Sequence, residues 1–540
     1  MEDAADLAWA ETLALLDQDP RGEFNAAHEI CGRWAAAEPD RVALTVVEDD
    51  GQFRRWTYGE LDRLSRACAT VLLDLGLRPG DRVAALLSRQ VESVVVALAT
   101  WGSGMVYVPL YCGLGADALR ERLVGSDARL VVVDQRWSTA LDAAVAALPE
   151  PPATLTVGGE ADTLWKRMAS REPQATLHRT RGTDTATLMF TSGTTGPAKA
   201  CAMPHHGLAS LVPFVRHGLG LVPGESRLFT TADPGWSYGL YTTGVVPMAL
   251  GIERVIYRGD FDARAWLEVV RDHEVTALAS APSAYRRLAP ALRDVGALPS
   301  LTTAAAGGEP LLAETAAAWQ DAGGPPIHDA YGLSEVGMVL GDTVSPPSGT
   351  RPGTLAGPVP GFDVRLVDAS GADVPAGTPG RIAITRPPFQ LASGYATHPA
   401  AWSARWAGDL FLTEDMAVTE PDGRWRFIGR TDDMIITKGF NVSPVEVETA
   451  IASLPAVVEV GVVPIDVPGR GTLVRAVLVV AEGHDPGEPL ERLVRETVTT
   501  RVARYAAPAV VDYVSELPRN EAGKLRRAAL RTDALAEPTS

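Results

Sequence analysis

A stretch of hydroxyl-bearing and glycine residues follows an apolar run and ends on a lysine. Thr187-Leu188-Met189-Phe190 is followed by Thr191, Ser192, Gly193, Thr194, Thr195, Gly196, Pro197, Ala198 and Lys199. Glycines expose backbone N–H groups to an anion, the hydroxyls add hydrogen-bond donors, and the lysine supplies a positive charge. This pattern predicts a loop that holds phosphate groups, although a plain surface turn can have the same composition. The spacing is not that of a P-loop, which requires G-x-x-x-x-G-K-[ST].

Lysine is rare in this chain of 540 residues. The basic residues are 45 arginines and four lysines, namely Lys166, Lys199, Lys438 and Lys524. Biased base composition explains an excess of arginine, but a guanidinium does not readily replace an ammonium where a compact point charge is needed. Each lysine is therefore a candidate for such a role.

Further motifs follow the loop in the order typical of one enzyme superfamily. They are Gly307-Gly308-Glu309, Tyr331-Gly332-Leu333-Ser334-Glu335, Gly429-Arg430 with Asp432-Asp433 and then Lys438-Gly439-Phe440, and Pro518-Arg519-Asn520-Glu521-Ala522-Gly523-Lys524. Together with the loop, these motifs resemble those of the adenylate-forming superfamily of acyl-CoA synthetases, nonribosomal-peptide adenylation domains and luciferases. The resemblance extends from near Asn25 to near Leu530, which is nearly the whole chain.

The resemblance implies a two-step reaction. In this family a carboxylic acid attacks the α-phosphate of ATP, giving an acyl-adenylate and pyrophosphate, and in the ligases a thiol then displaces AMP. Catalysis of the first step is mainly positioning and stabilisation of negative charge. Lys524 is expected to bridge the carboxylate and the α-phosphate, and Glu335 to hold Mg²⁺, a hard cation that prefers oxygen ligands. In isolation, Glu335 is more typical of a helix-cap partner and Lys524 of a solvated charge.

The resemblance also assigns the contacts to the nucleotide. The loop is expected to hold the β- and γ-phosphates, the double-glycine turn to contact the adenine, the tyrosine of the next motif to stack on it, and an aspartate and an arginine to hold the ribose. The residues concerned are Thr191, Ser192, Gly193, Thr194, Thr195, Gly196, Lys199, Gly307, Gly308, Glu309, Tyr331, Ser334, Asp415 and Arg430. His205, further along, is better explained as the start of a helix.

A two-pose mechanism is part of the same resemblance. The C-terminal domain is expected to swing about Asp432, so that one pose delivers Lys524 for adenylation and the other delivers Lys438 and Gly439 for thioester formation. Gly439 suits a pantetheine arm that passes close to the backbone. Hinges at the ends of elements are common in domain closure.

The segment Asp233-Pro234-Gly235-Trp236-Ser237-Tyr238-Gly239 indicates the branch of the superfamily. Its Gly-Trp pair resembles the acetyl-CoA and medium-chain acyl-CoA synthetases, and it lacks the Phe-Asp start with which amino-acid-activating domains hold an amine. No carrier-protein sequence follows Lys524, so free coenzyme A is the expected acceptor. Acetyl-specific members carry a tryptophan where this chain has Gly332. The expected substrate is therefore an acid larger than acetate, with Trp236, Tyr238 and Gly332 lining the acyl pocket.

Three positions depart from the family pattern. The loop ends Gly-Pro-Ala-Lys-Ala instead of Gly-x-Pro-Lys-Gly, Ser334 replaces a threonine, and Glu414 stands in the ribose motif where glycine is usual. A carboxylate that faced the nucleotide would repel a triphosphate more than the monoester of an adenylate. This leaves open an enzyme that performs only the thioester-forming half-reaction on a supplied acyl-adenylate. A member of the fold that only binds its ligands is a further alternative.

The elements that must position these residues follow from sequence periodicity. Strand-like runs alternate with helical patterns from about Ala35 to Ala330, which predicts an α/β fold with largely parallel sheets. Short strands separated by Gly and Pro turns follow between Gly353 and Trp425, and an α+β pattern follows Asp433. We expect an N-terminal domain, residues 1–431, of two α/β subdomains and a small β-rich lobe, and a mobile α+β C-terminal domain, residues 432–540.

Charge and composition limit the partners. The net charge of −18 is spread along the chain, which argues against a nucleic-acid or anionic-membrane partner. The uncharged run Val94–Ala116 is interrupted by glycines and predicts a buried helix, a turn and a strand, not a membrane span. Four cysteines without metal-ligand spacing and an acidic start without a signal-peptide pattern favour the cytoplasm. The oligomeric state stays open, with a homodimer as one alternative.

Overall fold

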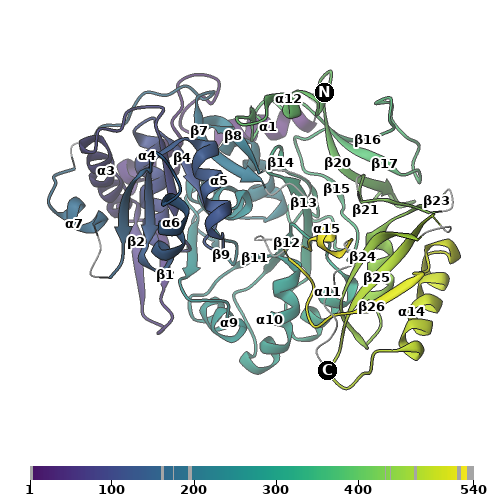
Figure 1. The fold of residues 1–540 in the computed structure, drawn as a ribbon. Coiled ribbons are helices and arrows are strands. Elements are labelled where there is room, and N and C mark those ends of the chain that lie inside the picture. The colour runs from purple at the N-terminus through teal and green to yellow at the C-terminus, as the bar shows by residue number, and fades with distance from the viewer. Residues whose placement is uncertain are drawn as a thin grey trace. The chain divides into compact units, whose positions relative to one another are not determined.

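The chain forms two compact units in the computed structural model (Figure 1). The structure describes residues 4–159, 163–173, 175–191, 198–431, 433–437, 440–467, 471–519 and 525–531. Unit 1 contains Met1–Thr191, Ala198–Val364 and Thr385–Asp409. Unit 2 contains Arg365–Ile384 and Leu410–Ser540, together with Ser192–Pro197, which lies outside the described residues. The predicted division at residue 432 depends on a hinge that also lies outside them, and it stays a prediction.

A nine-stranded sheet with a parallel centre forms part of unit 1. The neighbouring strands β13, β12, β11, β9, β10 and β1 pair in parallel, and β2, β14 and β15 add antiparallel edges. The order is β15 (Gly357–Pro358), β14 (Gly337–Gly341), β13 (Ile327–Leu333), β12 (Thr303–Gly307), β11 (Ala277–Ser280), β9 (Arg227–Thr230), β10 (Glu253–Tyr257), β1 (Val42–Val47) and β2 (Phe53–Thr57).

A seven-stranded sheet is the second sheet of unit 1. Its strands β7, β4, β3, β5 and β6 are parallel, and β8 and β18 complete one edge in antiparallel pairing. The order is β18 (Gly394–Tyr395), β8 (Lys199–Pro204), β7 (Thr185–Thr191), β4 (Val106–Pro109), β3 (Arg82–Leu86), β5 (Ala128–Asp134) and β6 (Ala153–Val157). The alternation of strand and helix along the sequence predicted both sheets.

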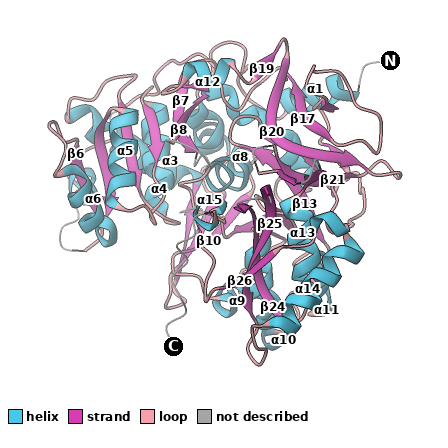
Figure 2. Ribbon diagram, turned by 45° about the vertical axis from the view of Figure 1, so that its right-hand side comes forward, coloured by secondary structure: helices cyan, strands magenta, loops and turns pink. Residues whose placement is uncertain are grey.

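Helices connect the parallel strands (Figure 2). α3 shows how local sequence sets a helix start, because the Thr57 hydroxyl accepts from the Glu60 N–H while the Glu60 carboxylate accepts from the Thr57 N–H. The helices of unit 1 are α1 (Ala4–Ala14), α2 (Arg33–Ala37), α3 (Tyr58–Asp74), α4 (Val91–Gly102), α5 (Ala116–Ser126), α6 (Ser138–Val145), α7 (Leu164–Ala169), α8 (Val246–Ala249), α9 (Ala263–Asp272), α10 (Pro282–Val295), α11 (Ala313–Asp321) and α12 (Pro399–Ser403).

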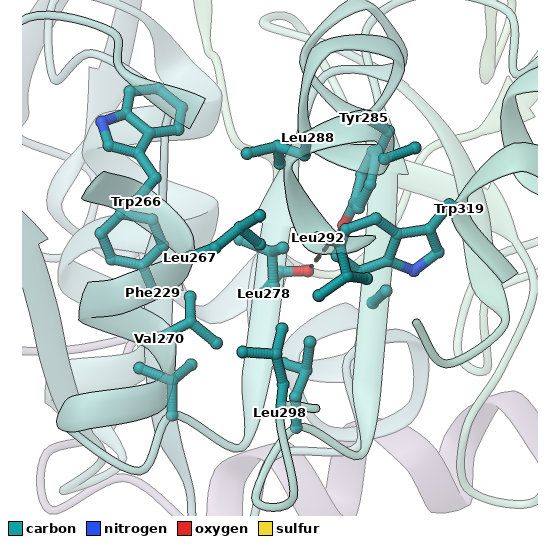
Figure 3. Close-up of a cluster of buried hydrophobic side chains, with 14 of the residues drawn as sticks. Phe229, Trp266, Leu267, Val270, Leu278, Tyr285, Leu288, Leu292, Leu298 and Trp319 are labelled. Atoms are coloured by element: carbon teal, nitrogen blue, oxygen red, sulfur yellow. Dashed lines mark hydrogen bonds between the residues drawn. The ribbon is translucent and has the colours of Figure 1, made fainter. Parts of the chain in front are cut away.

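A large buried cluster joins α9, α10 and α11 to the nine-stranded sheet (Figure 3). Trp266 packs its ring against Phe229 of β9, and Tyr285 packs against Trp319. The Tyr285 hydroxyl donates to the carbonyl of Leu278, 3.0 Å away, so the polar atom of this buried ring is satisfied. The cluster makes the parallel strands a rigid support for the loops at their ends.

The uncharged run Val94–Ala116 folds as expected from its glycines. It contains most of α4, then β4, and it ends where α5 begins. Among the described residues, no helix combines the length and the apolar character that crossing a membrane requires.

Unit 2 contains a β-rich and an α+β segment; the sequence predicted segments of both kinds but assigned the β-rich lobe to the N-terminal domain. Strands β16 (Val364–Val367), β17 (Gly380–Thr385) and β20 (Leu410–Thr419) are neighbours in that order, and β21 (Trp425–Arg430) pairs with β20. A three-stranded sheet packs its apolar side chains with those of two helices, α13 and α14. The remaining elements are β22 (Ile435–Thr437), β23 (Phe440–Val442), α13 (Pro444–Ala452), β24 (Val457–Val467), β25 (Gly471–Val480), α14 (Glu488–Arg501), β26 (Val510–Tyr513) and α15 (Arg527–Leu530).

Candidate active site

Three motifs begin at or near the carboxyl ends of parallel strands of unit 1. β7 ends at Thr191, where the predicted phosphate loop begins, and β12 ends at Gly307. β13 runs through Tyr331 and ends at Leu333, two residues before Glu335. Ligands of open α/β sheets bind at this edge because the connecting loops gather there. β7 belongs to the seven-stranded sheet, whereas β12 and β13 belong to the nine-stranded sheet, so each motif lies at the edge of its own sheet where ligands are expected.

The double-glycine turn and the tyrosine motif are direct neighbours. Gly307 of β12 lies opposite Ala330 of β13 in parallel register. Gly308 has φ +90°, a conformation that favours glycine. Glu309 Oε1 accepts a hydrogen bond of 2.8 Å from the Ser283 hydroxyl at the start of α10. Sequence reasoning missed Ser283, since nothing in its local sequence marks it.

Tyr238 links the predicted acyl pocket to this turn. A Cβ atom added at Gly307 would lie 3.8 Å from the Tyr238 ring. The Tyr238 hydroxyl is buried and has no hydrogen-bond partner among the described residues. Trp236, two residues earlier, packs its ring against Tyr111 with centroids 5.2 Å apart. Tyr111 is a further aromatic neighbour that the sequence did not indicate.

Gly332 has no room for a side chain in this backbone conformation. A Cβ atom at this position would overlap the carbonyl oxygen of Gly337 and lie 2.8 Å from the Cα atom of Met338. The backbone of β14 therefore fills the side on which the Gly332 side chain would stand. The assignment of Gly332 to the acyl pocket stays a prediction.

Two buried carboxyl groups that sequence reasoning missed lie beside the tyrosine motif. Asp329 of β13 and Asp342, which follows β14, are both buried. Asp342 Oδ2 accepts a hydrogen bond from the Asp329 backbone N–H. Burial, and secondarily the charge of Asp342, raises the pKa of Asp329 to about 8. Asp329 therefore holds a proton near neutral pH and can donate a hydrogen bond.

Glu335 is held by Tyr395. The Tyr395 hydroxyl donates to Glu335 Oε1 at 2.6 Å, and the Lys199 ammonium lies 5.4 Å from the centre of the Tyr395 ring. For Oε2 of Glu335, the described part of the chain contains no hydrogen-bond or ion-pair partner. One oxygen is thus available to a cation, which fits the preference of Mg²⁺ for one or two carboxylates. The sequence predicted Lys199 and Glu335 but not Tyr395.

In unit 2 the predicted ribose-binding residues lie on two adjacent strands. Asp415 of β20 is opposite Arg430 of β21. The Arg430 guanidinium forms an ion pair with the Glu414 carboxylate, and each side chain is about a third or less exposed. Glu414 is therefore not the bare carboxylate that its place in the ribose motif raised as an expectation. Its charge is compensated by a residue that was itself expected to bind ribose.

Several predicted site residues cannot be placed. They lie outside the described residues, and their roles stay predictions: Ser192, Gly193, Thr194, Thr195, Gly196, Asp432, Lys438, Gly439 and Lys524. Thr191 and Lys199, at the two ends of the loop, are described, and the Thr191 hydroxyl donates to the Lys199 carbonyl at 3.3 Å. The nucleotide role of Ser334, which is described, also stays a prediction.

Family models match the chain in two segments. Residues 31–396 match the model of the AMP-binding enzyme, and residues 446–524 match that of the AMP-binding enzyme C-terminal domain. The chain belongs to the AMP-binding enzyme family. This confirms the superfamily resemblance of the motifs and identifies an AMP-forming acid–thiol ligase.

Relatives match over nearly the full length. The chain is 32% identical to mouse acyl-coenzyme A synthetase ACSM5, mitochondrial, over 96% of this chain and 92% of the relative. The crystal structure of Brucella canis acyl-CoA synthetase shares 31% identity with a TM-score of 0.75, covering 97% of this chain and 96% of that one. The anthranilate CoA ligase AuaEII, solved with anthranoyl-AMP, shares 26% identity with a TM-score of 0.84, covering 94% and 96%. The predicted α/β fold, with a larger N-terminal and a smaller C-terminal part, is confirmed.

Proposed function

We propose that this AMP-forming ligase converts a carboxylic acid larger than acetate, through an acyl-adenylate, into its coenzyme A thioester. The observation that carries the proposal is the grouping in unit 1 of the Gly307-Gly308 turn, the tyrosine motif and Tyr238. Residues proposed to contact the nucleotide and the acid are thereby neighbours, as an acyl-adenylate requires. The names of the matched relatives, acyl-coenzyme A synthetase and anthranilate CoA ligase, support the reaction class.

The proposed acid has an apolar body. Trp236, whose ring packs on Tyr111, and Tyr238 are proposed to supply aromatic surface to the acid, because aromatic rings bind apolar groups through large contact areas. Such a pocket would gain little from acetate, whose apolar part is a single methyl group. The size preference thus rests on these rings as well as on the absence of a tryptophan at position 332.

Glu335 is the proposed ligand of Mg²⁺, and the lack of a partner for its Oε2 within the described part of the chain supports this role. Bound there, the cation would offset the negative charge of the phosphates. Lys524 is proposed to stabilise charge during adenylation, and Lys438 with Gly439 to serve the thioester step. Asp415 and Arg430 are proposed to hold the ribose. A cytoplasmic location and an acceptor that is free coenzyme A complete the proposal.

The half-reaction alternative loses its electrostatic basis. It assumed that a bare Glu414 carboxylate repels the triphosphate, whereas the structure pairs this carboxylate with Arg430. A compensated charge discriminates weakly between ATP and an adenylate, because the fields of the paired charges largely cancel at a distance. Full ligase activity is therefore the function that we favour.

A comparison of two substrate sets tests the proposal. In one set the protein is incubated with ATP, Mg²⁺, coenzyme A and one of acetate, hexanoate, octanoate, benzoate or anthranilate. In the other it receives coenzyme A and the matching synthetic acyl-adenylates. We expect thioester and AMP from both sets for the larger acids, detected by mass spectrometry, and little product from acetate. Thioester from the adenylates alone would establish the half-reaction enzyme, and absence of thioester from both sets would contradict the ligase.

A further inference from the structure

The segment from Ala392 to Tyr395 holds Glu335 at two points. The Ala392 backbone N–H donates to the Glu335 carbonyl at 3.2 Å, and the Tyr395 hydroxyl donates to the Glu335 carboxylate at 2.6 Å. A residue fixed through both its main chain and its side chain has little freedom to rotate its carboxylate. The remaining oxygen, Oε2, therefore has a defined direction.

Tyr395 is itself firmly placed. Only 2% of its surface is exposed, and it lies opposite Cys201 in the antiparallel pair of β18 and β8. The edge of the Trp402 ring packs against it with centroids 5.3 Å apart. A short hydrogen bond from a buried hydroxyl to a carboxylate is stronger than one between neutral groups. These contacts make Tyr395 a rigid support and not an adaptable one.

The same ring contacts the end of the phosphate loop. Lys199 precedes Cys201 by two residues on β8, so both side chains project from the same face of that strand. The Lys199 ammonium lies 5.4 Å from the Tyr395 ring centre, within the range of a cation–π interaction. One buried ring thus contacts both the carboxylate and the lysine that the motifs assign to the ATP phosphates.

We propose that Tyr395 is a positioning residue that orients the Glu335 carboxylate for Mg²⁺ and couples it to Lys199. The inference rests on the proposed function, in which Glu335 holds the metal bound to ATP. Groups that hydrogen-bond to metal ligands fix the orientation of those ligands, and their loss typically lowers metal affinity or activity by about 10-fold to 100-fold. Tyr395 acts through Glu335 and need not touch the metal or the nucleotide.

Binding of ATP measured by calorimetry without an acid substrate tests this role independently of turnover. The dissociation constant of ATP is determined in excess Mg²⁺ and again in EDTA. The ratio of the two constants gives the metal-dependent gain in ATP affinity. Tyr395→Phe keeps the ring, its packing on Trp402 and its contact with Lys199, and removes only the hydroxyl. We expect it to reduce the metal-dependent gain by about 10-fold, with little change in ATP affinity in EDTA.

Tyr58→Phe is the matched control. Tyr58 is also fully buried, and its hydroxyl donates to the Met248 carbonyl at 2.7 Å, outside the motifs. Both variants lose one buried hydrogen bond and are expected to lower the melting temperature, but Tyr58→Phe should leave the metal-dependent gain unchanged. An unchanged gain in Tyr395→Phe, or an equal loss of ATP affinity with and without Mg²⁺, would overturn the positioning role.

Glu335→Gln separates this inference from the proposed function. It should abolish most of the metal-dependent gain. If Glu335→Gln retained the gain, Glu335 would not be the metal ligand, and the role of Tyr395 would fail with it. If Glu335→Gln lost the gain and Tyr395→Phe kept it, the metal site would stand and only the positioning role would be wrong. Thioester synthesis by the wild type is a separate outcome that neither result decides.

Discussion

At the scale of single residues, Glu414 and Gly332 mark where this chain differs from its family pattern. Glu414 occupies the position that is usually glycine, and it pairs with Arg430. By the motif resemblance, Gly332 is expected at the position of a tryptophan in acetyl-specific members, and β14 backbone atoms stand where its side chain would begin. Each difference changes what a neighbouring group can do, so each yields a prediction for a single substitution.

Replacing Glu414 by Gln is expected to strengthen ATP binding. The change removes the carboxylate charge that competes with the ribose hydroxyls for the Arg430 guanidinium. Because both side chains are partly exposed, the pair contributes at most about 1 kcal/mol, which corresponds to a decrease of about fivefold in the KM for ATP. Steady-state kinetics with varied ATP measures it.

Glu420→Gln is the matched control for this substitution. Glu420 forms an ion pair of 2.6 Å with Arg426 near the other end of β21, outside the ribose motif. Loss of the Glu420–Arg426 ion pair should leave the KM for ATP unchanged. A rise in KM for Glu414→Gln would show that Glu414 supports the nucleotide site instead of competing for Arg430.

Gly332→Ala is expected to destabilise unit 1. Its Cβ would overlap backbone atoms that cannot move without shifting β14, and forced overpacking of this kind typically costs about 1–3 kcal/mol. Thermal melting measures the effect. Gly394→Ala is the control, since no atom lies within 4 Å of its added Cβ. Equal melting temperatures for the two variants would show that β13 and β14 can separate locally.

At the scale of elements, the strands were predictable from local pattern. The apolar run Thr187–Phe190 lies within β7, and the alternation of strand-like and helical runs from about Ala35 to Ala330 covers the parallel strands of both sheets of unit 1. The reason is that apolar runs bounded by turn residues are local signals. Residues that tie one element to another carry no such signal, and His205 is an example.

His205 starts a short helix, His205–Leu211, as the sequence favoured, and it also connects two distant segments. Its Nδ1 accepts a hydrogen bond of 3.1 Å from the Ala26 N–H, so the ring must be neutral there. Burial is the main cause that lowers the pKa of His205 to about 4, while Asp184 opposes this and His206 and His178 add to it. A charged ring would lose the acceptor that holds residue 26.

This geometry predicts acid destabilisation. The folded-state pKa is depressed below the ordinary value of 6.5, so the stabilisation is fully present above pH 6.5 and is lost as the pH falls towards 4. The difference corresponds to about 3 kcal/mol. Melting temperatures between pH 4 and 7 should fall more steeply for the wild type than for His205→Asn, whose side-chain oxygen can accept the same bond without titrating. Parallel curves would contradict the assignment.

At the scale of the whole molecule, the two steps of the reaction are proposed to use different lysines. Lys524 is assigned to adenylation and Lys438 to thioester formation, and both lie outside the described residues. Alternation between two poses of the C-terminal domain about Asp432 would let one site serve both steps. The prediction that follows is kinetic and does not depend on where the two units lie.

Substituting each lysine by alanine should separate the two steps. Lys524→Ala is expected to slow adenylate formation by about 100-fold or more, because it removes a group that stabilises charge in the transition state. Thioester formation from a synthetic adenylate should be retained. Lys438→Ala should show the opposite pattern. Lys166→Ala, which changes the lysine without an assigned role, is the control. Pyrophosphate exchange and thioester assays measure the steps, and equal losses in both steps for Lys524→Ala would argue against two poses.

The sequence by itself determined the family, the reaction class and the motif residues, because these depend on residue types at short, fixed spacings. It also determined most strands and helices, because periodicity and turn residues act locally. Only the tertiary structure decided that Tyr395 holds Glu335, that Glu414 pairs with Arg430 and that Tyr111 packs on Trp236. These contacts depend on which strands become neighbours and on which face each side chain projects, and both follow from burying the apolar surface of the whole unit.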